Sequence, residues 1–287
     1  MRNVRGRGFD EHPSGSRRAA GRPPRIGVAL GGGVARALAQ VGVMRAWARE
    51  GLPVDCIAAT SSGAIVGALW AAGLDMERME ELARNVRWLR NVIGFAFPRL
   101  GLLSSHKISR FLRETVGVEE FAQLKIPLAV ITVDLQRHEE CVLTSGDLGR
   151  AVQASCSIPG IFKPVEVGGR LLVDGGVLNN LPGDVARAMG ADVVVGVDVN
   201  RRARSRSPVA RPDSLAQVVF HCLVMMIERN TAEKRRACDY LIEPEMDEIG
   251  YLDLDRWGEL LERGEAAARP VLRALRTALL EPERCTS

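Results

Sequence analysis

The chain has 287 residues, of which 46% are hydrophobic and 5% aromatic, and its formal net charge is +4. This length and composition are those of a soluble globular protein with one large buried core, or at most two smaller ones, and they exclude a wholly disordered or fibrous chain. Residues 1–25 hold seven arginines and two acidic residues, a net +5, so the rest of the chain sums to −1 and no nucleic-acid partner is expected.

Residues 1–25 are rich in Arg, Gly, Pro and Ser and lack the apolar stretch of a secretory signal. This composition predicts a disordered basic tail. Such a tail can contact an anionic membrane surface, although a solvated tail without a partner is the simpler interpretation. The six cysteines form no CxxC pair, so they indicate neither a zinc site nor a disulfide framework. We therefore expect a cytoplasmic protein whose contact with membranes, if any, is peripheral.

The first structured element is an apolar run over residues 26–30, which ends at three consecutive glycines, residues 31–33. Apolar residues then recur at helical spacing over residues 34–50. Residues 54–73 repeat this arrangement, because an apolar run stops at the small polar cluster 60–63 and restarts with helical spacing. Two strand–turn–helix units in succession predict an α/β fold with a largely parallel sheet flanked by helices.

A transmembrane helix is the alternative interpretation of the second unit. Residues 56–74 contain no charge and approach the length that spans a bilayer. Polar residues and three glycines interrupt them, however, and Asp55 and Asp75 bracket them. A strand that turns into a helix therefore fits these residues better.

The later elements continue to alternate. Residues 75–123 are predicted to be mostly helical. The apolar side chains between Val86 and Phe97 fit burial in the core, but their position between the Ser61 turn and the next strand favours a roof over a site. The further predictions, in order, are paired strands at 128–133 and 140–144, a helix at 149–157, strands at 170–173 and 192–199, a helix at 214–236, a strand at 238–242 and a helix at 255–280. Asp198 is interpreted as a solvated strand end, and residues 179–182 as the cap of a helix that begins at Pro182.

Three turns combine into a candidate active site: the glycines at 31–33, the turn at Ser61, and the turn at Asp174. Each follows a strand, which is where open α/β sheets bind ligands. A serine at a sharp strand-to-helix turn is a candidate nucleophile. It needs a base within hydrogen-bond reach, and the carbonyl that it attacks needs N–H donors aimed at the developing oxyanion. Ser61, Asp174 and the backbone of residues 31–34 could supply all three.

A catalytic triad is a competing interpretation. Ser61, Asp174 and His221 occur in the order of a triad on an α/β-hydrolase sheet. His221, however, lies in an apolar run with helical spacing, whereas a triad base belongs on an adjustable loop. We therefore interpret His221 as an ordinary helix residue.

The motifs together resemble the patatin-like phospholipases, particularly the bacterial branch. The resemblance rests on a strand followed by GGG-x-x-Arg and a helix, a T-S-x-G turn at 60–63, D-G-G at 174–176 and N-N-L-P at 179–182, and it extends over about residues 26–275. It implies a three-layer patatin-like fold with a catalytic core over residues 26–200. Residues 201–287 would then be a basic loop and a helical part packed on the same domain.

The resemblance also implies an activity, a lipid acyl hydrolase of lipid metabolism that uses a Ser–Asp dyad. Ser61 would be the acylated nucleophile and Asp174 the base that takes its proton. The substrate would be an acyl lipid or another ester, and neither a metal nor an organic cofactor is expected. The turn from Gly32 to Val34 would donate to the oxyanion, and Arg36 would hold that turn. The neighbouring residues assigned to substrate binding are Gly33, Ser62, Gly63, Gly175 and Gly176.

The sequence departs from the family pattern at three glycines and one histidine. Val34, Ala37 and Ala59 replace glycines, and Gln40 stands where bacterial relatives often have histidine. If residue 34 needs a positive φ, a valine either strains the turn or directs its N–H away from the oxyanion. Two hypotheses follow: a working phospholipase or esterase of reduced activity, and a catalytically impaired relative that binds acyl lipids or a partner.

Overall fold

The computed structural model describes residues 22–85, 106–201 and 212–280. Most of the predicted basic tail and the predicted apolar roof between Val86 and Phe97 lie outside these residues, as does most of the loop that follows Arg201. The division of the chain into a tail, a core and a C-terminal part therefore stays a prediction.

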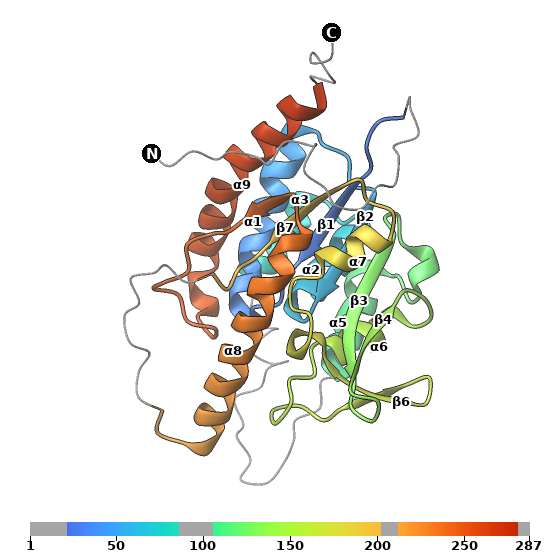
Figure 1. The fold of residues 1–287 in the computed structure, drawn as a ribbon, viewed down its shortest axis with the longest axis vertical. Coiled ribbons are helices and arrows are strands. Elements are labelled where there is room, and N and C mark those ends of the chain that lie inside the picture. The colour runs from blue at the N-terminus through green and yellow to red at the C-terminus, as the bar shows by residue number, and fades with distance from the viewer. Residues whose placement is uncertain (1–21, 86–105, 202–211, 281–287) are drawn as a thin grey trace.

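One mixed sheet organises the described residues, with the strand order β5-β6-β3-β2-β1-β7-β8 and with β4 paired to β3 (Figure 1). The five strands from β3 to β8 run parallel, whereas β4, β5 and β6 join by antiparallel pairing. The prediction of a largely parallel sheet is therefore confirmed. The strands are β1 (Ile26–Leu30), β2 (Cys56–Thr60), β3 (Leu128–Asp134), β4 (Glu139–Leu143), β5 (Val165–Val167), β6 (Arg170–Asp174), β7 (Val193–Val197) and β8 (Tyr240–Ile242).

Helices cover both faces of this sheet, because alternate side chains of each strand point to opposite sides. Val28 and Leu30 of β1 belong to the main core, which packs under α1, α2 and α9, whereas Ala29 belongs to a second cluster under α7. The three-layer architecture is therefore confirmed. The helices are α1 (Ala39–Glu50), α2 (Ser62–Ala71), α3 (Met76–Arg84), α5 (His106–Val116), α6 (Leu148–Ser155), α7 (Gly183–Ala188), α8 (Leu215–Lys234) and α9 (Trp257–Leu280), with short 3-10 helices η1 (Val34–Leu38), η3 (Gly175–Val177) and η4 (Arg235–Ala237) between them.

Outside residues 86–105, which the structure does not describe, the predicted strands and helices appear with ends that shift by a few residues, and the first five residues of the predicted 34–50 helix form the 3-10 helix η1. One strand, β5, has no counterpart among the predictions, because its three residues are too few to carry an alternating pattern. The charge-free stretch at 56–74 forms β2 and α2, as predicted. Among the described helices, none is long and apolar enough to cross a membrane.

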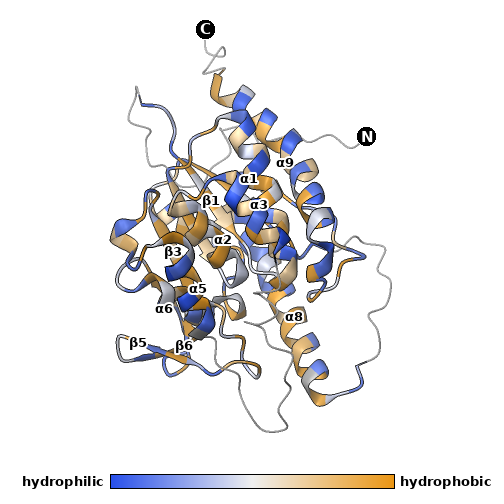
Figure 2. Ribbon diagram, turned by 180° about the vertical axis from the view of Figure 1, so that it is seen from behind, coloured by the Kyte–Doolittle hydropathy of each residue, from blue (hydrophilic) through white to orange (hydrophobic). Residues whose placement is uncertain are grey.

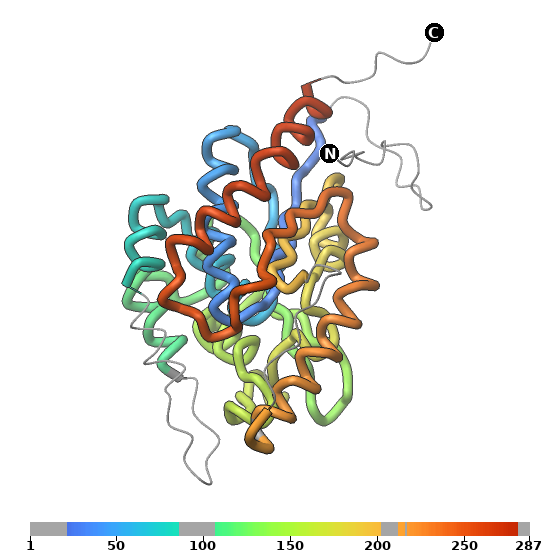
Figure 3. Tube along the Cα trace, turned by 90° about the vertical axis from the view of Figure 1, so that its left-hand side faces the viewer, coloured from blue at the N-terminus to red at the C-terminus, as the bar shows by residue number. Residues whose placement is uncertain are grey.

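The last helix, α9, lies along the first, α1, in direct backbone contact (Figure 3). A Cβ at Gly42 of α1 would lie 1.9 Å from the carbonyl oxygen of Leu261, and a Cβ at Gly264 would lie 1.9 Å from that of Ala39. Beside this crossing, the buried Glu265 accepts ion pairs from arginines of both helices, namely Arg45, Arg49 and Arg269. Small residues at the crossing therefore allow α1 and α9 to approach each other closely.

We predict that Gly264→Ala destabilises the protein by about 1–3 kcal/mol, because the added methyl forces α9 away from α1. The measurement is the free energy of unfolding by urea. Gly258→Ala is the matched control: it makes the same change in the same helix, where a Cβ would meet nothing within 4 Å. The control should be neutral or stabilising because alanine favours a helix. Equal effects of the two substitutions would contradict the close crossing.

Candidate active site

The pairing of strands on β3 brings Ser61 and Asp174 together. Thr60, the last residue of β2, pairs with Ile131 of β3, and the next residue of β3, Thr132, pairs with Asp174 at the end of β6. Because β4 occupies the opposite edge of β3, β2 and β6 follow one another along the same edge. The chain therefore leaves both strands at one point, which places the two predicted dyad residues side by side.

Ser61 lies at the sharp turn between β2 and α2. Its φ of 55° and ψ of −130° are sparsely populated for a residue with a side chain. Hydrogen bonds hold this turn: the N–H of Ser61 donates to Ser155 Oγ at 2.8 Å, and the Ser155 hydroxyl donates to the carbonyl of Ile131 at 2.6 Å. A Cβ at Gly63 would lie 2.6 Å from the Leu30 carbonyl oxygen, so a glycine lets α2 begin directly against β1.

The two predicted dyad residues are in direct contact. The Ser61 hydroxyl donates to Asp174 Oδ2 at 2.6 Å, and the other carboxylate oxygen accepts from the N–H of Gly176 at 2.8 Å. Only 8% of Ser61 and 4% of Asp174 is exposed. Burial raises the pKa of Asp174 to about 6, although these two hydrogen bonds oppose the rise. The carboxylate is therefore a stronger base than an exposed aspartate and is still ionised at neutral pH.

Close backbone contact explains one glycine of the Asp174 turn. A Cβ at Gly175 would lie 2.3 Å from the carbonyl oxygen of Ile131, so a larger residue would separate β6 from β3. His221 lies on α8 and does not line the pocket that contains Ser61 and Asp174. Because the serine hydroxyl reaches the carboxylate directly, the described residues assemble a pair and not a triad with His221.

The peptide between Gly32 and Gly33 is held at both its carbonyl and its N–H. The carbonyl of Gly32 accepts from the side-chain amides of Asn180, at 3.3 Å, and Asn200. The N–H of Gly33 donates to Ser62 Oγ at 2.9 Å. Since the C=O and N–H of one peptide point in opposite directions, these contacts set its orientation. A Cβ at Gly32 would lie 2.7 Å from Ser61 Cβ, so a glycine is required where the turn approaches the serine.

Two N–H groups of this turn remain available beside Ser61. Gly33 donates to Ser62, and Ala35 donates to the carbonyl of Tyr251 at 3.0 Å. Within the described part of the chain, the N–H groups of Gly32 and Val34 donate to no acceptor. Val34 keeps a φ of 52°, so of the two outcomes expected for a valine here, strain is the one that occurs. Such a conformation costs on the order of 1–3 kcal/mol for a β-branched residue.

Arg36 holds the start of η1 against the segment that precedes α9. Its buried guanidinium donates through Nε and Nη2 to the carbonyl of Ile249, at 2.9 and 2.6 Å, and lies 4.1 Å from the ring centre of Tyr251. From the other side, the amide of Gln40 donates to the carbonyl of Gly31 at 2.6 Å. Arg36 and Gln40, which follow the glycine turn directly in sequence, thus help to hold it in place.

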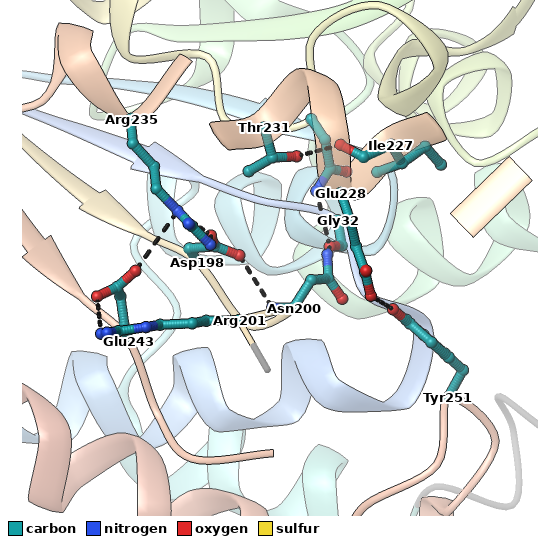
Figure 4. Close-up of polar contacts among 11 residues, drawn as sticks. Gly32, Asp198, Asn200, Arg201, Ile227, Glu228, Thr231, Arg235, Glu243 and Tyr251 are labelled. Carbon is teal, nitrogen blue, oxygen red and sulfur yellow. Dashed lines mark hydrogen bonds and ion pairs between the residues drawn. The ribbon is translucent and has the colours of Figure 1, made fainter. Parts of the chain in front are cut away.

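A buried ionic contact continues from Asn200 (Figure 4). Asp198 is only 1% exposed; its Oδ1 accepts from the N–H of Asn200 at 2.9 Å, and its Oδ2 accepts from Arg235 Nε at 2.8 Å. Arg235 also approaches Glu243, which pairs with Arg201. The interpretation of Asp198 as a solvated strand end is therefore wrong, because Arg235 covers it. Asp198 instead fixes the backbone of the residue whose amide holds Gly32.

Three positioning residues escaped the sequence analysis: Ser155, Asn180 and Asn200. Residues 179–182 were interpreted as a helix cap in preference to a lining of the substrate opening, and α7 does begin after Pro182. The amide of Asn180, however, donates to Gly32, and Asn180 lines the pocket that contains Ser61. Asn200 follows the carboxyl end of β7, where the position alone could have suggested a site role. Ser155 sits in a helix with no local sign that it supports another turn.

Two pockets open beside Ser61, and both are also lined by Val34. One, of about 470 Å³, contains Asp174 and runs along α8, where Phe220, Val224 and Ile227 line it. The other, of about 580 Å³, is lined by apolar residues that include Ile65, Ile108, Ile161 and Phe162. The serine therefore faces a pocket lined largely by apolar side chains on two sides.

In the described ranges, no group of three or more His, Cys, Asp or Glu side chains could hold a metal ion.

Comparisons with known proteins identify relatives. A family model described as patatin-like phospholipase matches residues 28–187. Patatin-like phospholipase domain-containing protein 7 of Mus musculus is 31% identical over 280 residues, 86% of this chain and 20% of that protein. An NTE family protein of Mycobacterium tuberculosis is 35% identical over 199 residues, 68% of this chain and 54% of that protein. The chain thus spans about a fifth of the length of the mouse relative and about half that of the mycobacterial one.

One solved structure supports the fold. The crystal structure of VipD from Legionella pneumophila superposes with a TM-score of 0.56 and 12% sequence identity, over 88% of this chain and 67% of that one. At this level of identity the similarity concerns the architecture alone.

The raised pKa of Asp174 predicts a pH dependence. Only the ionised carboxylate can take the serine proton, so the rate of covalent labelling by a fluorophosphonate should fall to half its plateau near pH 6 as the solution is acidified. The measurement is the labelling rate between about pH 5 and about pH 8. A rate that stays flat over this range, or that falls only near the usual pKa of an aspartate, would contradict the assigned base.

Removal of the amide that holds Gly32 should affect turnover more than substrate binding. We expect Asn200→Ala to lower kcat on a chromogenic ester roughly 10- to 100-fold with a smaller change in KM, because the freed peptide no longer presents its neighbours in one orientation. The matched control is Arg201→Ala, which removes only the exposed end of the same ionic contact and should cost little. Equal losses in both variants, or an unchanged kcat in the first, would show that Asn200 does not position the turn.

Proposed function

The chain belongs to the patatin-like phospholipase family, a family of lipid hydrolases, and we propose that it is a serine lipid acyl hydrolase that uses Ser61 and Asp174. The observation that carries this proposal is the 2.6 Å hydrogen bond from the Ser61 hydroxyl to a buried carboxylate. Its substrate class is an acyl ester of a phospholipid, a lysophospholipid or a related lipid. No metal or organic cofactor enters the reaction that follows.

Acylation starts with Asp174 as the general base. As Ser61 Oγ attacks the carbonyl carbon of the ester, its proton passes to Asp174 Oδ2, with which it already shares a hydrogen bond. The carbonyl π-electrons move to the oxygen, and the N–H groups of Gly32 and Val34 are the proposed donors to this oxyanion. Collapse of the tetrahedral intermediate expels the alcohol, which takes the proton from Asp174 and leaves an acyl-enzyme.

Deacylation repeats the same steps with water as the nucleophile. Asp174 takes a proton from the attacking water, and the oxyanion forms again at the same donors. The serine oxygen then leaves and recovers its proton from Asp174, which releases a free fatty acid. One carboxylate can serve both half-reactions because it returns to its ionised form after each.

The surroundings of Ser61 favour an acyl chain as the bound group. The pocket lined by Ile65, Ile161 and Phe162 is apolar, and it meets the serine beside Val34. An acyl chain placed there leaves the polar part of the substrate toward α8 and the solvent. This arrangement supports an ester with at least one long chain over a small water-soluble ester.

The impaired-relative hypothesis receives less support. It rested on Val34, Ala37 and Ala59, of which Val34 was expected to disturb the proposed oxyanion donors. In the structure Val34 takes the positive φ that a glycine would take, and its N–H is unoccupied within the described residues. The valine thus carries a conformational cost while its N–H stays unoccupied among the described residues. Reduced stability, more than lost activity, is the expected consequence.

Covalent labelling with a fluorophosphonate, combined with turnover of p-nitrophenyl esters, tests the proposal. The wild-type protein should be labelled and active, whereas Ser61→Ala should lose both, and Asp174→Asn, which preserves shape but cannot take a proton, should lose at least about 99% of each rate. Ser145→Ala changes an exposed serine in a turn and serves as the control that keeps both. A folded wild-type protein that is neither labelled nor active would favour the impaired relative.

A further inference from the structure

The outer face of α8 exposes large apolar side chains. Leu215 is 79% exposed, Met225 60% and Met226 57%, and Val218 and Val219 are each more than 40% exposed. From Leu215 to Ile227 the helix contains no charged residue. In the ribbon of Figure 2, hydrophobic residues predominate along α8, whereas hydrophobic and hydrophilic residues alternate along α9. A soluble surface seldom keeps so many large apolar side chains together unless another surface covers them.

The same helix lines the pocket beside Ser61 with its inner face. Phe220, Val224 and Ile227 face the pocket. At 100° per residue these positions lie on the side opposite to Leu215 and Met226. Because α8 is apolar on both faces, packing against the core accounts for only one of them.

Two further exposed apolar residues lie next to the pocket. Leu252 is 49% exposed and lines the pocket with Ile65 and Phe162. Leu178 is 37% exposed and follows Val177, which lines the pocket along α8. Exposed apolar side chains therefore occur beside the two pockets as well as on α8.

The charge of the adjoining sequence distinguishes between possible occupants of this face. Residues 201–213, which lead into α8, contain five arginines and one aspartate. Their net charge of 5 − 1 = +4 favours a partner surface that carries negative charge over a second copy of the chain, which carries the same arginines. An anionic phospholipid surface offers both an apolar interior for the side chains and negative headgroups for the arginines.

We propose that the outer face of α8, formed by Leu215, Val218, Val219, Cys222, Met225 and Met226, inserts into an anionic phospholipid surface, and that this places the pocket openings against the membrane. This inference rests on the proposed function in one respect: the lipid surface to which α8 binds is also the source of the substrate. The docking itself needs no catalysis. It explains why an apolar helix face stays exposed beside an active site that must receive a chain from a bilayer.

The test is co-sedimentation with vesicles of phosphatidylcholine and phosphatidylglycerol. It uses the Ser61→Ala protein, so that hydrolysis does not alter the vesicles. This protein should bind, and added Leu215→Gln and Met226→Gln substitutions should weaken binding about tenfold or more, because two apolar side chains no longer enter the lipid. Glutamine keeps the helix propensity of these positions, and an unchanged circular dichroism spectrum verifies the fold. Vesicles of phosphatidylcholine alone should bind more weakly.

The matched control is Val142→Gln with Leu171→Gln, two exposed apolar residues of β4 and β6, which should leave vesicle binding unchanged. Equal binding by both double variants would overturn the proposal. A wild-type dimer in light scattering that the α8 substitutions convert to a monomer, without a change in vesicle binding, would also overturn it.

With Ser61 intact, the α8 variant should keep its turnover of short soluble esters but lose turnover of vesicle lipids. Vesicle binding by a protein that hydrolyses nothing would retain the docking surface and reject the proposed function.

Discussion

The site depends on a constraint that lies in the sheet. One edge of β3 pairs first with β2 and then with β6, so consecutive residues, Ile131 and Thr132, pair with Thr60 and Asp174. This pairing places Ser61, which follows Thr60, next to Asp174. A shift of β6 by one residue would send Asp174 to the opposite face of the sheet. The geometry of the pair is thus set by backbone hydrogen bonds, which vary less than the side chains of loops.

The surrounding residues keep this arrangement despite its costs. Ser61 and Val34 both hold positive φ values, and Asp174 is buried as an ionisable group. The raised pKa of Asp174 means that the folded protein binds a proton more tightly than the unfolded chain does. Stability therefore falls as the pH rises from the usual aspartate range through about 6, and the ionised carboxylate is a net cost at neutral pH. Such costs are typical of functional sites, where the reactive state needs support from its neighbours.

The sequence was sufficient for the parts of the fold that depend on local patterns. Apolar runs that end at glycines or at the Ser61 turn located β1, β2 and the helices after them, and the order of motifs identified the family. The contacts that complete the site join residues that lie far apart in the sequence. Asn200 reaches Gly32 across 168 residues, and Arg235 reaches Asp198 from the end of α8. No spacing in the sequence encodes such contacts, which is why Asp198 was misinterpreted as solvated.

The central claim is that Ser61 forms the covalent intermediate. Peptide mapping by mass spectrometry after rapid acid quench of a reaction with a p-nitrophenyl ester tests it most directly. The account predicts an added acyl mass on the peptide that contains Ser61, which disappears as the ester is consumed. An acyl group found on another residue, or turnover with no covalent intermediate at Ser61 even when deacylation is slowed, would contradict it.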